Sequence, residues 1–199
     1  RQRKIHLKNI LKEIIATNKE SHKETVIMDL AGGPGRYLLE TIQENPDRGL
    51  TVICRDMSEE ALAGGKELAG KFKIQKIIYE KADAFSPEDF KKASPKPNVI
   101  VVSGLYELFT DDSVIRKSMR DISNVLPLGG YYVFTNQPYH PQLELIACVL
   151  PNRNGEPWVM RLRSDEEVKR WASEAGFQTI KTLIDHEGIF SVTLAKKVS

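Results

Sequence analysis

The chain has 199 residues, of which 41% are hydrophobic and 28% charged, and it contains 13 glycines and 10 prolines. This composition excludes collagen-like, coiled-coil and wholly disordered chains, and the length favours one domain over residues 1–199. The formal net charge of +2 is too small a surplus to indicate a nucleic-acid partner.

Cysteine content and hydropathy bear on the cellular compartment of the protein. Two cysteines are too few for a disulfide framework, and we therefore expect a reducing, cytoplasmic environment. No apolar run approaches the roughly 18 residues of a membrane-spanning helix, and no signal-peptide core follows the basic start. Because the first residue is not Met, we expect the chain to be part of a longer protein.

The opening segment, residues 1–20, has apolar residues at helical spacing and lysines on the opposite face. We expect an amphipathic helix that covers the sheet or the cleft at its edge. Burial against a sheet accounts for this pattern more simply than attachment to a membrane surface. The apolar positions are Ile5, Leu7, Ile10, Leu11, Ile14 and Ile15.

Seven short apolar segments with helical segments between them predict an α/β fold. The first strand is a continuous apolar run, as expected for a strand buried on both faces. Among the helices, 58–71 and 165–174 are the clearest, and Ser164 with Glu167 forms a capping-box pattern. The predicted strands are 25–30, 50–54, 76–80, 98–102, 131–135, 178–184 and 189–195. We expect a three-layer sandwich whose mostly parallel sheet ends in an antiparallel hairpin.

The first strand ends in a glycine-rich turn, Asp29 to Gly35. Gly33 and Gly35 give the backbone freedom to approach a ligand, and the helix that starts at Arg36 favours an anionic group. Asp29 adds a negative charge, so a zwitterionic or cationic ligand would suit the turn. A dinucleotide fingerprint needs glycine where Leu38 stands, which disfavours NAD, and a P-loop would need Gly-Lys-Ser/Thr at the end of the turn.

The turn resembles the first motif of class I S-adenosylmethionine-dependent methyltransferases, an acid followed by alternating glycines. Residues 55–58 look like the second motif, whose acid, here Asp56, meets the ribose hydroxyls. Residues 81–85 look like the third, whose acid, here Asp83, meets the adenine amino group. This resemblance implies a Rossmann-like fold and S-adenosylmethionine as cofactor. The implied cofactor-binding residues are Asp29, Ala31, Gly32, Gly33, Gly35, Asp56, Met57, Asp83, Ala84, Phe85 and Ser103.

One position departs from the pattern. Ala31 stands where glycine is commonest, which costs little if its φ is negative and would crowd the ligand if its φ is positive.

A tighter resemblance covers nearly the whole chain. It is to a bacterial methyltransferase family without an assigned substrate, often fused C-terminal to an α/β-hydrolase domain. The resemblance implies methyl transfer to a small-molecule or lipid-like acceptor, with a fused or associated hydrolase domain as a candidate partner. The alternative function is a catalytically silent cofactor-binding or docking domain of such a fusion. The segments that carry the resemblance are 35–37, 103–109, 136–144, 158–163 and 188–190.

Several residues are candidates for the acceptor side. Tyr106 and Glu107 follow the fourth strand directly, where the methyl group is expected, but either can instead pack or cap the next helix. His140, in the loop 136–144, is a candidate general base or a structural loop residue. The candidate substrate-binding residues are Tyr37, Tyr139 and Arg161. Arg161 and Arg163 alternate along an extended segment and can clamp an anion or form an exposed strand face.

Two site classes are not indicated by the sequence. Asn98 stands where many relatives carry an acid, and no cluster of metal-ligating residues is evident, so we expect no metal. Residues 136–139 are similar to the Asn-Pro-Pro-Tyr motif of DNA amino-methyltransferases, but they follow the fifth predicted strand rather than the fourth. No basic stripe accompanies them, so we expect no nucleic-acid substrate.

Overall fold

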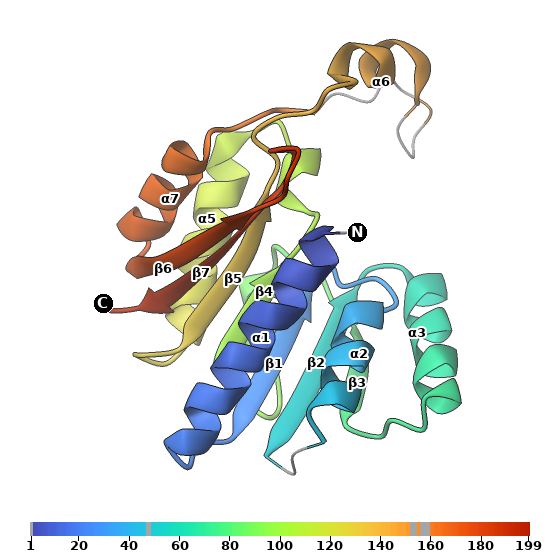
Figure 1. Cartoon of the computed structure of the whole chain (residues 1–199), viewed down its shortest axis with the longest axis vertical. Coiled ribbons are helices and arrows are strands. Elements are labelled where there is room, and N and C mark those ends of the chain that lie inside the picture. The colour runs from blue at the N-terminus through green and yellow to red at the C-terminus, as the bar shows by residue number, and fades with distance from the viewer. Residues whose placement is uncertain (1, 47–48, 152–154, 156–159) are drawn as a thin grey trace.

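A computed structural model describes residues 2–46, 49–151, 155 and 160–199. Its centre is one seven-stranded sheet with the strand order β3-β2-β1-β4-β5-β7-β6 (Figure 1). Strands β1 to β5 pair in parallel, whereas β7 runs antiparallel to both β5 and β6. The strands are β1 (Thr25–Leu30), β2 (Leu50–Asp56), β3 (Ile77–Lys81), β4 (Val99–Val102), β5 (Tyr131–Asn136), β6 (Phe177–Ile184) and β7 (Ser191–Lys197).

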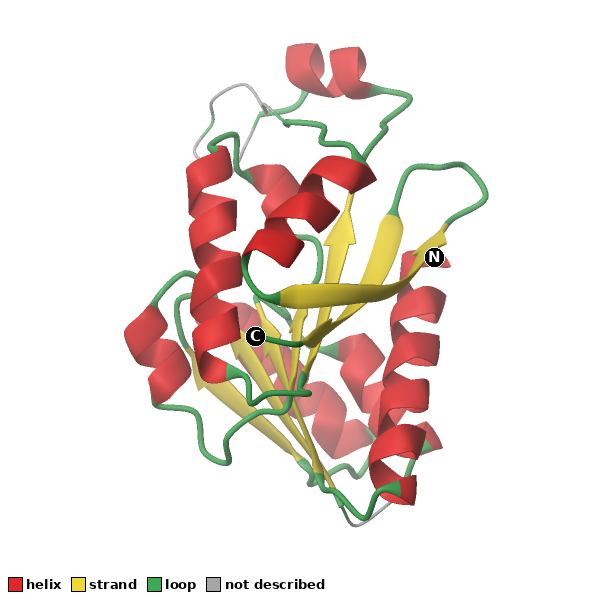
Figure 2. Cartoon of the chain, turned by 90° about the vertical axis from the view of Figure 1, so that its left-hand side faces the viewer, coloured by secondary structure: helices red, strands yellow, loops and turns green. Residues whose placement is uncertain are grey.

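Helices cover both faces of this sheet, which Figure 2 shows nearly edge-on. The first three helices pack on one face, and α4, α5 and α7 pack on the other. The helices are α1 (Gln2–Glu20), α2 (Arg36–Glu44), α3 (Glu59–Lys71), α4 (Pro87–Lys91), the 3₁₀ turn η1 (Tyr106–Leu108), α5 (Asp112–Val125), α6 (Leu143–Val149) and α7 (Asp165–Glu174). The predicted three-layer, Rossmann-like sandwich with a C-terminal antiparallel pair is therefore confirmed.

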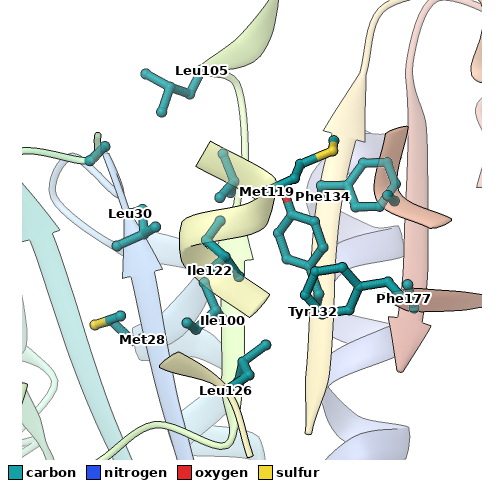
Figure 3. Packing of buried hydrophobic residues seen from close by; sticks show 14 of the residues in the cluster. Met28, Leu30, Ile100, Leu105, Met119, Ile122, Leu126, Tyr132, Phe134 and Phe177 are labelled. Carbon is teal, nitrogen blue, oxygen red and sulfur yellow. The ribbon is translucent and has the colours of Figure 1, made fainter. Parts of the chain in front are cut away.

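Two apolar clusters, one on each face, hold the layers together. On the α5 side, Met119 and Ile122 of that helix pack over Ile100 of β4 and Tyr132 of β5 (Figure 3). All four are fully buried, and burial of a side chain of this size stabilises the fold by about 1.5–3 kcal/mol. Because both faces of the central strands are covered, β4 is a continuous apolar run, and β1 is apolar except for Thr25 and Asp29.

The predicted N-terminal helix is confirmed as α1, and its apolar face packs against the sheet. Ile5 is an exception to the predicted face, because its side chain is 45% exposed. The N-terminal end of α1 lies near the carboxyl ends of the strands (Figure 1), and Arg3 and Lys4 line a cavity there. The helix thus covers both the sheet and the edge of the cleft.

The other predicted elements differ from the structure by only a few residues at their ends. Helix α7 spans 165–174 as predicted, and the Ser164 hydroxyl accepts a hydrogen bond from the Glu167 N–H at 3.1 Å. The second strand of the final hairpin starts at Ser191 rather than at residue 189, because Asp185 folds the connection by accepting hydrogen bonds from the N–H groups of Ile189 and Phe190.

An excursion of residues 137–162 leaves the end of β5 and carries α6 away from the body of the fold (Figure 1). No residue of α6 is buried, and Leu145 and Val149 are more than half exposed. At the base of the excursion, the Asn136 side-chain amide donates to the Arg163 carbonyl at 2.9 Å and to Asp165 Oδ1 at 2.8 Å. The two ends of the excursion are therefore pinned to each other. Trp158 and Val159, part of a segment that carries the family resemblance, lie outside the described residues.

Candidate cofactor site

Two adjoining cavities open at the carboxyl ends of β1, β2 and β4, where parallel α/β sheets bind ligands. The Asp56 cavity has a volume of about 350 Å³ and the Asp29 cavity about 280 Å³, and Ala31 lines both. The Asp56 cavity is lined by Ala31, Asp56, Met57, Ala82, Asp83, Ala84, Phe85, Gly104, Leu105, Leu108 and Phe109. The Asp29 cavity is lined by Arg3, Lys4, Leu7, Asp29, Ala31, Gly32, Pro34, Gly35, Arg36, Tyr37 and Ser103.

The structure brings together all of the residues predicted to bind the cofactor except Gly33. That glycine lies in the same turn, and its N–H donates to Asp56. The three acids predicted from separate motifs thus lie around one pair of cavities. This follows from the topology, because β1 pairs directly with β2, and β2 with β3.

Asp56 ends β2 and organises the floor of its cavity. One carboxylate oxygen accepts a hydrogen bond from the Gly33 N–H at 2.8 Å, and the other accepts one from the Ser58 N–H at 2.8 Å. Each carboxylate oxygen has a second lone pair, so Asp56 retains acceptor capacity toward hydroxyl groups of a ligand.

The loop after β3 supplies another part of the lining of the Asp56 cavity. Asp83 is exposed and folds its own loop, because its side chain accepts a hydrogen bond from the Phe85 N–H at 2.9 Å. The Phe85 ring meets the Phe109 ring edge to face with centroids 4.7 Å apart. An acid beside two aromatic rings can hold a flat, amino-bearing ring by hydrogen bonding and packing.

Asp29 is fully buried at the wall of the second cavity, and its two oxygens differ. Tyr37, from the first turn of α2, donates its hydroxyl hydrogen to Oδ2 at 2.7 Å, whereas Oδ1 has no partner among the described residues. Burial raises the pKa of Asp29 to about 7; the Tyr37 hydrogen bond opposes the rise, and the charge of Asp56 adds to it. A buried acceptor without a donor costs free energy that a cationic donor, such as an ammonium group, would offset.

The glycine turn is shaped around Asp29. A Cβ at Gly32 would lie 2.5 Å from Asp29 Oδ2, so only glycine fits there. Ala31 has a φ of +60°. At a positive φ we expect its side chain to crowd the ligand. This left-handed conformation is strained for alanine by about 1–2 kcal/mol, and its methyl group stands where the two cavities meet.

The prediction that Tyr106 is a catalytic residue is wrong, because its side chain does not face the site. Its side chain is only 4% exposed and points into the core, where its hydroxyl lies 2.7 Å from that of Tyr132 and 3.0 Å from that of Ser118. Burial raises the pKa of Tyr106 to about 12. The packing alternative is therefore the one that the structure supports for this residue.

Glu107 faces the other way, toward the N-terminal end of α1. Its carboxylate is buried with Oε2 unpartnered among the described residues, and Oε1 lies 3.5 Å from Arg3 Nη1. Burial raises the pKa of Glu107, and the charges of Arg3 and Arg163 oppose that rise. The Arg3 guanidinium carbon in turn lies 4.6 Å from the centre of the Phe190 ring.

Three other candidates for the acceptor side lie outside the residues described as lining the two cavities. Tyr139 is 52% exposed, and His140 accepts a hydrogen bond at Nδ1 from the Gln142 N–H at 3.1 Å, which folds its own loop. Arg161 is ion-paired with Asp112 at 2.6 Å. Tyr37 does line the Asp29 cavity.

Sequence reasoning missed the role of Arg163, which is buried rather than part of an exposed strand face. Its guanidinium donates to Asp112 at 2.8 Å and to the backbone carbonyls of Phe109, at 2.6 Å, and Tyr106, at 3.3 Å. Arg163 therefore fixes η1, whose neighbours Leu105 and Phe109 line the Asp56 cavity. The Arg-x-Arg spacing gave no signal of this burial.

Within the described ranges, no group of three or more His, Cys, Asp and Glu side chains is arranged to hold a metal ion. No described helix is long and apolar enough to cross a membrane. Cys54 lies beneath the glycine turn, 3.5 Å from the Gly33 carbonyl, and burial raises the pKa of its thiol. Its position gives it a packing role.

A family model described as "Putative methyltransferase" matches residues 1–197. The uncharacterized protein YnbC of Escherichia coli strain K12 is 38% identical over 197 residues, which cover 98% of this chain and 34% of YnbC. The chain therefore spans about a third of the length of this curated relative.

Solved structures share the fold over most of the chain. A possible exported protein from Bordetella parapertussis matches with TM-score 0.75 and 20% identity, over 100% of this chain and 68% of that one. Magnesium protoporphyrin IX methyltransferase from Synechocystis PCC 6803, solved with bound SAH, matches with TM-score 0.68 and 10% identity, over 97% and 84% of the two chains. At these identities the likeness concerns the fold alone.

Proposed function

The chain belongs to this methyltransferase family, and we propose that it transfers a methyl group from S-adenosylmethionine to a small-molecule or lipid-like acceptor. When bound, S-adenosylmethionine supplies the methyl group on a sulfonium, which is a good leaving group. The observation that carries the proposal is that Asp56 and Asp83 line one cavity while buried Asp29 leaves an acceptor oxygen unpartnered in the next.

The Asp56 cavity suits a nucleoside. Asp56 would accept hydrogen bonds from ribose hydroxyls, since its two backbone donors leave further lone pairs. Asp83 would accept one from the adenine amino group, and Phe85 would pack on the ring. These contacts would come from the ends of β2 and β3, which are neighbours in the sheet.

The Asp29 cavity suits the amino-acid end of the cofactor. Asp29 Oδ1 would accept a hydrogen bond from the ammonium group, and Tyr37 would keep Oδ2 oriented through its 2.7 Å hydrogen bond. An ammonium partner favours the charged form of Asp29, so the bound state would lower the raised pKa of this acid.

Catalysis at this site would be mainly a matter of positioning the acceptor atom near the methyl carbon. For an oxygen or nitrogen acceptor, a base must also remove a proton. Glu107 remains a candidate because its carboxylate lies 3.5 Å from Arg3, which lines the Asp29 cavity, although Glu107 is not itself among the described residues that line either cavity. His140 remains a candidate only if its loop approaches the site when an acceptor binds.

We also propose that the domain works with a fused or associated α/β-hydrolase domain, in the cytoplasm. The greater length of YnbC supports the first part, because two thirds of that protein lie outside the match. In such a fusion, we expect the substrate or product of the hydrolase domain to reach the carboxyl ends of the strands, where the two cavities open.

Calorimetric titration with S-adenosylmethionine, S-adenosylhomocysteine and NAD tests the cofactor. We expect micromolar binding of the first two, roughly −7 to −9 kcal/mol, and none of NAD. A metabolite extract incubated with methyl-labelled cofactor and resolved by mass spectrometry then tests transfer. Binding without any labelled product would favour a catalytically silent domain, and preference for NAD would contradict the proposal.

A further inference from the structure

Three separate elements converge above the junction of the two cavities. Arg3 comes from α1, Glu107 from η1 and Phe190 from the connection between β6 and β7. The Arg3 guanidinium lies against Gly104, where a Cβ would be 3.1 Å from Nη1. Gly104 lines the Asp56 cavity and Arg3 lines the Asp29 cavity, so this guanidinium stands where the cavities meet.

The donors of Arg3 are largely unused within the described residues. Its contacts there are the Glu107 carboxylate at 3.5 Å, which is beyond a good hydrogen bond, and the face of the Phe190 ring. The ring holds the guanidinium plane in place without using its N–H groups. The side chain is 36% exposed, so a molecule entering the cleft can reach the unused donors.

Among the described residues, the Asp29 cavity is lined by three cationic side chains, those of Arg3, Lys4 and Arg36, and by one acid, Asp29, so this excess of cations favours an anion beside Arg3. Lys4 and Arg36 both form ion pairs with the same acid, Glu40. Its Oε1 lies 2.9 Å from Lys4 Nζ and 3.4 Å from Arg36 Nε. Glu107 is the nearest acid to Arg3, but it is too distant to satisfy it and keeps one oxygen unpartnered. Because the pair of Arg3 and Glu107 is this long, a carboxylate that comes closer to Arg3 can replace Glu107.

We propose that Arg3 is a carboxylate-binding residue at the junction of the cavities, with Glu107 as the partner that an incoming carboxylate replaces. A planar carboxylate would pair with the guanidinium through two parallel hydrogen bonds, which Glu107 does not make. This inference rests on the proposed function for its meaning: a carboxylate that belongs to the acceptor makes the acceptor a small organic acid. The cofactor's own carboxylate offers the same chemistry, and the experiment distinguishes the two sources.

The test compares wild type with Arg3→Gln, and Lys12→Gln serves as the matched control. Lys12 lies on the same helix, is similarly exposed and pairs with Glu44, so this control removes the same charge away from the site. Benzoate is titrated by NMR into each protein, with and without saturating S-adenosylhomocysteine, and neutral benzamide is titrated in parallel. Calorimetry gives the affinities for S-adenosylhomocysteine and for 5′-methylthioadenosine, which lacks the amino-acid part.

If Arg3 takes the acceptor's carboxylate, Arg3→Gln weakens benzoate binding to the cofactor-loaded protein by about 10-fold or more and leaves S-adenosylhomocysteine affinity unchanged. If it takes the cofactor's carboxylate, S-adenosylhomocysteine binds about 10-fold more weakly while 5′-methylthioadenosine binds as before. Lys12→Gln should change neither. Arg3→Gln proteins that bind all of these compounds like wild type would overturn the assignment.

Glu107→Gln supplies an independent arm. If Glu107 competes for Arg3, loss of its charge should strengthen benzoate binding at least severalfold, whereas weaker binding would contradict its role as the replaced partner. Failure of the wild type to bind S-adenosylhomocysteine would refute the proposed function. The Arg3 assignment would then be decided by the benzoate titration of the unloaded protein, where equal affinities of wild type and Arg3→Gln would refute it as well.

Discussion

Asp56 Oδ2 accepts a hydrogen bond from the Gly33 N–H at 2.8 Å, which ties the acid at the end of β2 to the glycine turn after β1. Two loops that are 23 residues apart along the chain are thereby held as one unit. The acid has two tasks, because it fixes the turn and also presents its free lone pairs to the cavity.

The first prediction concerns Asp56→Ala. Loss of the carboxylate should weaken binding of S-adenosylhomocysteine by about 1–3 kcal/mol, the scale of a charge-assisted hydrogen bond, while the domain stays folded. Calorimetry and a thermal melt on the same sample measure both. Asp121→Asn, which removes an acid paired with Lys117 on α5, is the control and should leave the affinity unchanged. Unchanged affinity in Asp56→Ala would remove Asp56 from the site.

The second prediction is a pH dependence caused by Asp29. Its pKa is about 7 in the folded chain and 3.8 for an ordinary aspartate, so the folded state binds more protons between these values. The free energy of unfolding that Asp29 contributes must therefore fall as the pH rises from about 4 to 7, by up to a few kcal/mol. Denaturant titrations at pH 5 and pH 8 should show a larger loss for wild type than for Asp29→Asn. Parallel losses in the two proteins would contradict the raised pKa.

The same acid predicts how ligand binding responds to pH. Because an ammonium group prefers the charged form of Asp29, affinity for S-adenosylhomocysteine should rise as the pH passes through about 7. In Asp29→Asn the affinity should be lower and nearly independent of pH over this range.

The third prediction is that Ala31→Gly does not destabilise the chain. At φ of +60° the change relieves strain of about 1–2 kcal/mol, and the added freedom of the unfolded chain cancels up to about 1 kcal/mol of that gain. Ala63→Gly, inside α3, should by contrast cost about 1 kcal/mol. Chemical denaturation of both variants checks this. If Ala31→Gly is the less stable of the two, the strain at Ala31 is not real.

The fourth prediction concerns the buried guanidinium of Arg163. Its side chain is 2% exposed and joins Asp112 to the carbonyl of Tyr106 in η1 and to that of Phe109 directly after it. Arg163→Met should lower the free energy of unfolding by about 1–3 kcal/mol, because it leaves the Phe109 carbonyl and one Asp112 oxygen without this donor. The other Asp112 oxygen keeps its pair with Arg161, and the Tyr106 carbonyl still accepts from the Phe109 N–H. Arg116→Met, which removes an exposed pair with Glu174, should cost less than about 1 kcal/mol. Similar losses in the two variants would show that Arg163 is not a structural anchor.

The sequence predicts the sheet well because local signals and tertiary packing agree in it. Residues 26–28 are a continuous apolar run, and the whole strand, residues 25–30, is buried. The acids Asp29, Asp56 and Asp83 are identified through the motifs that the chain resembles. They lie together because each is within two residues of the end of a strand, and neighbouring parallel strands bring such positions to one edge.

Side-chain direction after β4 could not be predicted. In the tight turn η1, Tyr106 points into the core and the next residue, Glu107, points toward α1. No periodicity of two or 3.6 residues applies to three residues of 3₁₀ helix. Arg163 was unpredictable for a different reason, because its partner Asp112 is 51 residues away in the chain.

Helix α6 was also missed, since its seven residues form a short apolar run that carries no helical period. The excursion that contains it nevertheless has well-defined ends.

The hydrogen bonds of Asn136 to Arg163 and Asp165 give this excursion a fixed pair of anchor points. A segment whose ends are held together in this way places no demand of length or shape on what lies between them. We therefore expect the sheet and the two cavities to tolerate changes in the chain between these anchors, provided that buried Gln137 and the pair of Arg161 with Asp112 are kept. Chimeras built at these anchors would then change α6 and its loops while keeping every described residue that lines the two cavities.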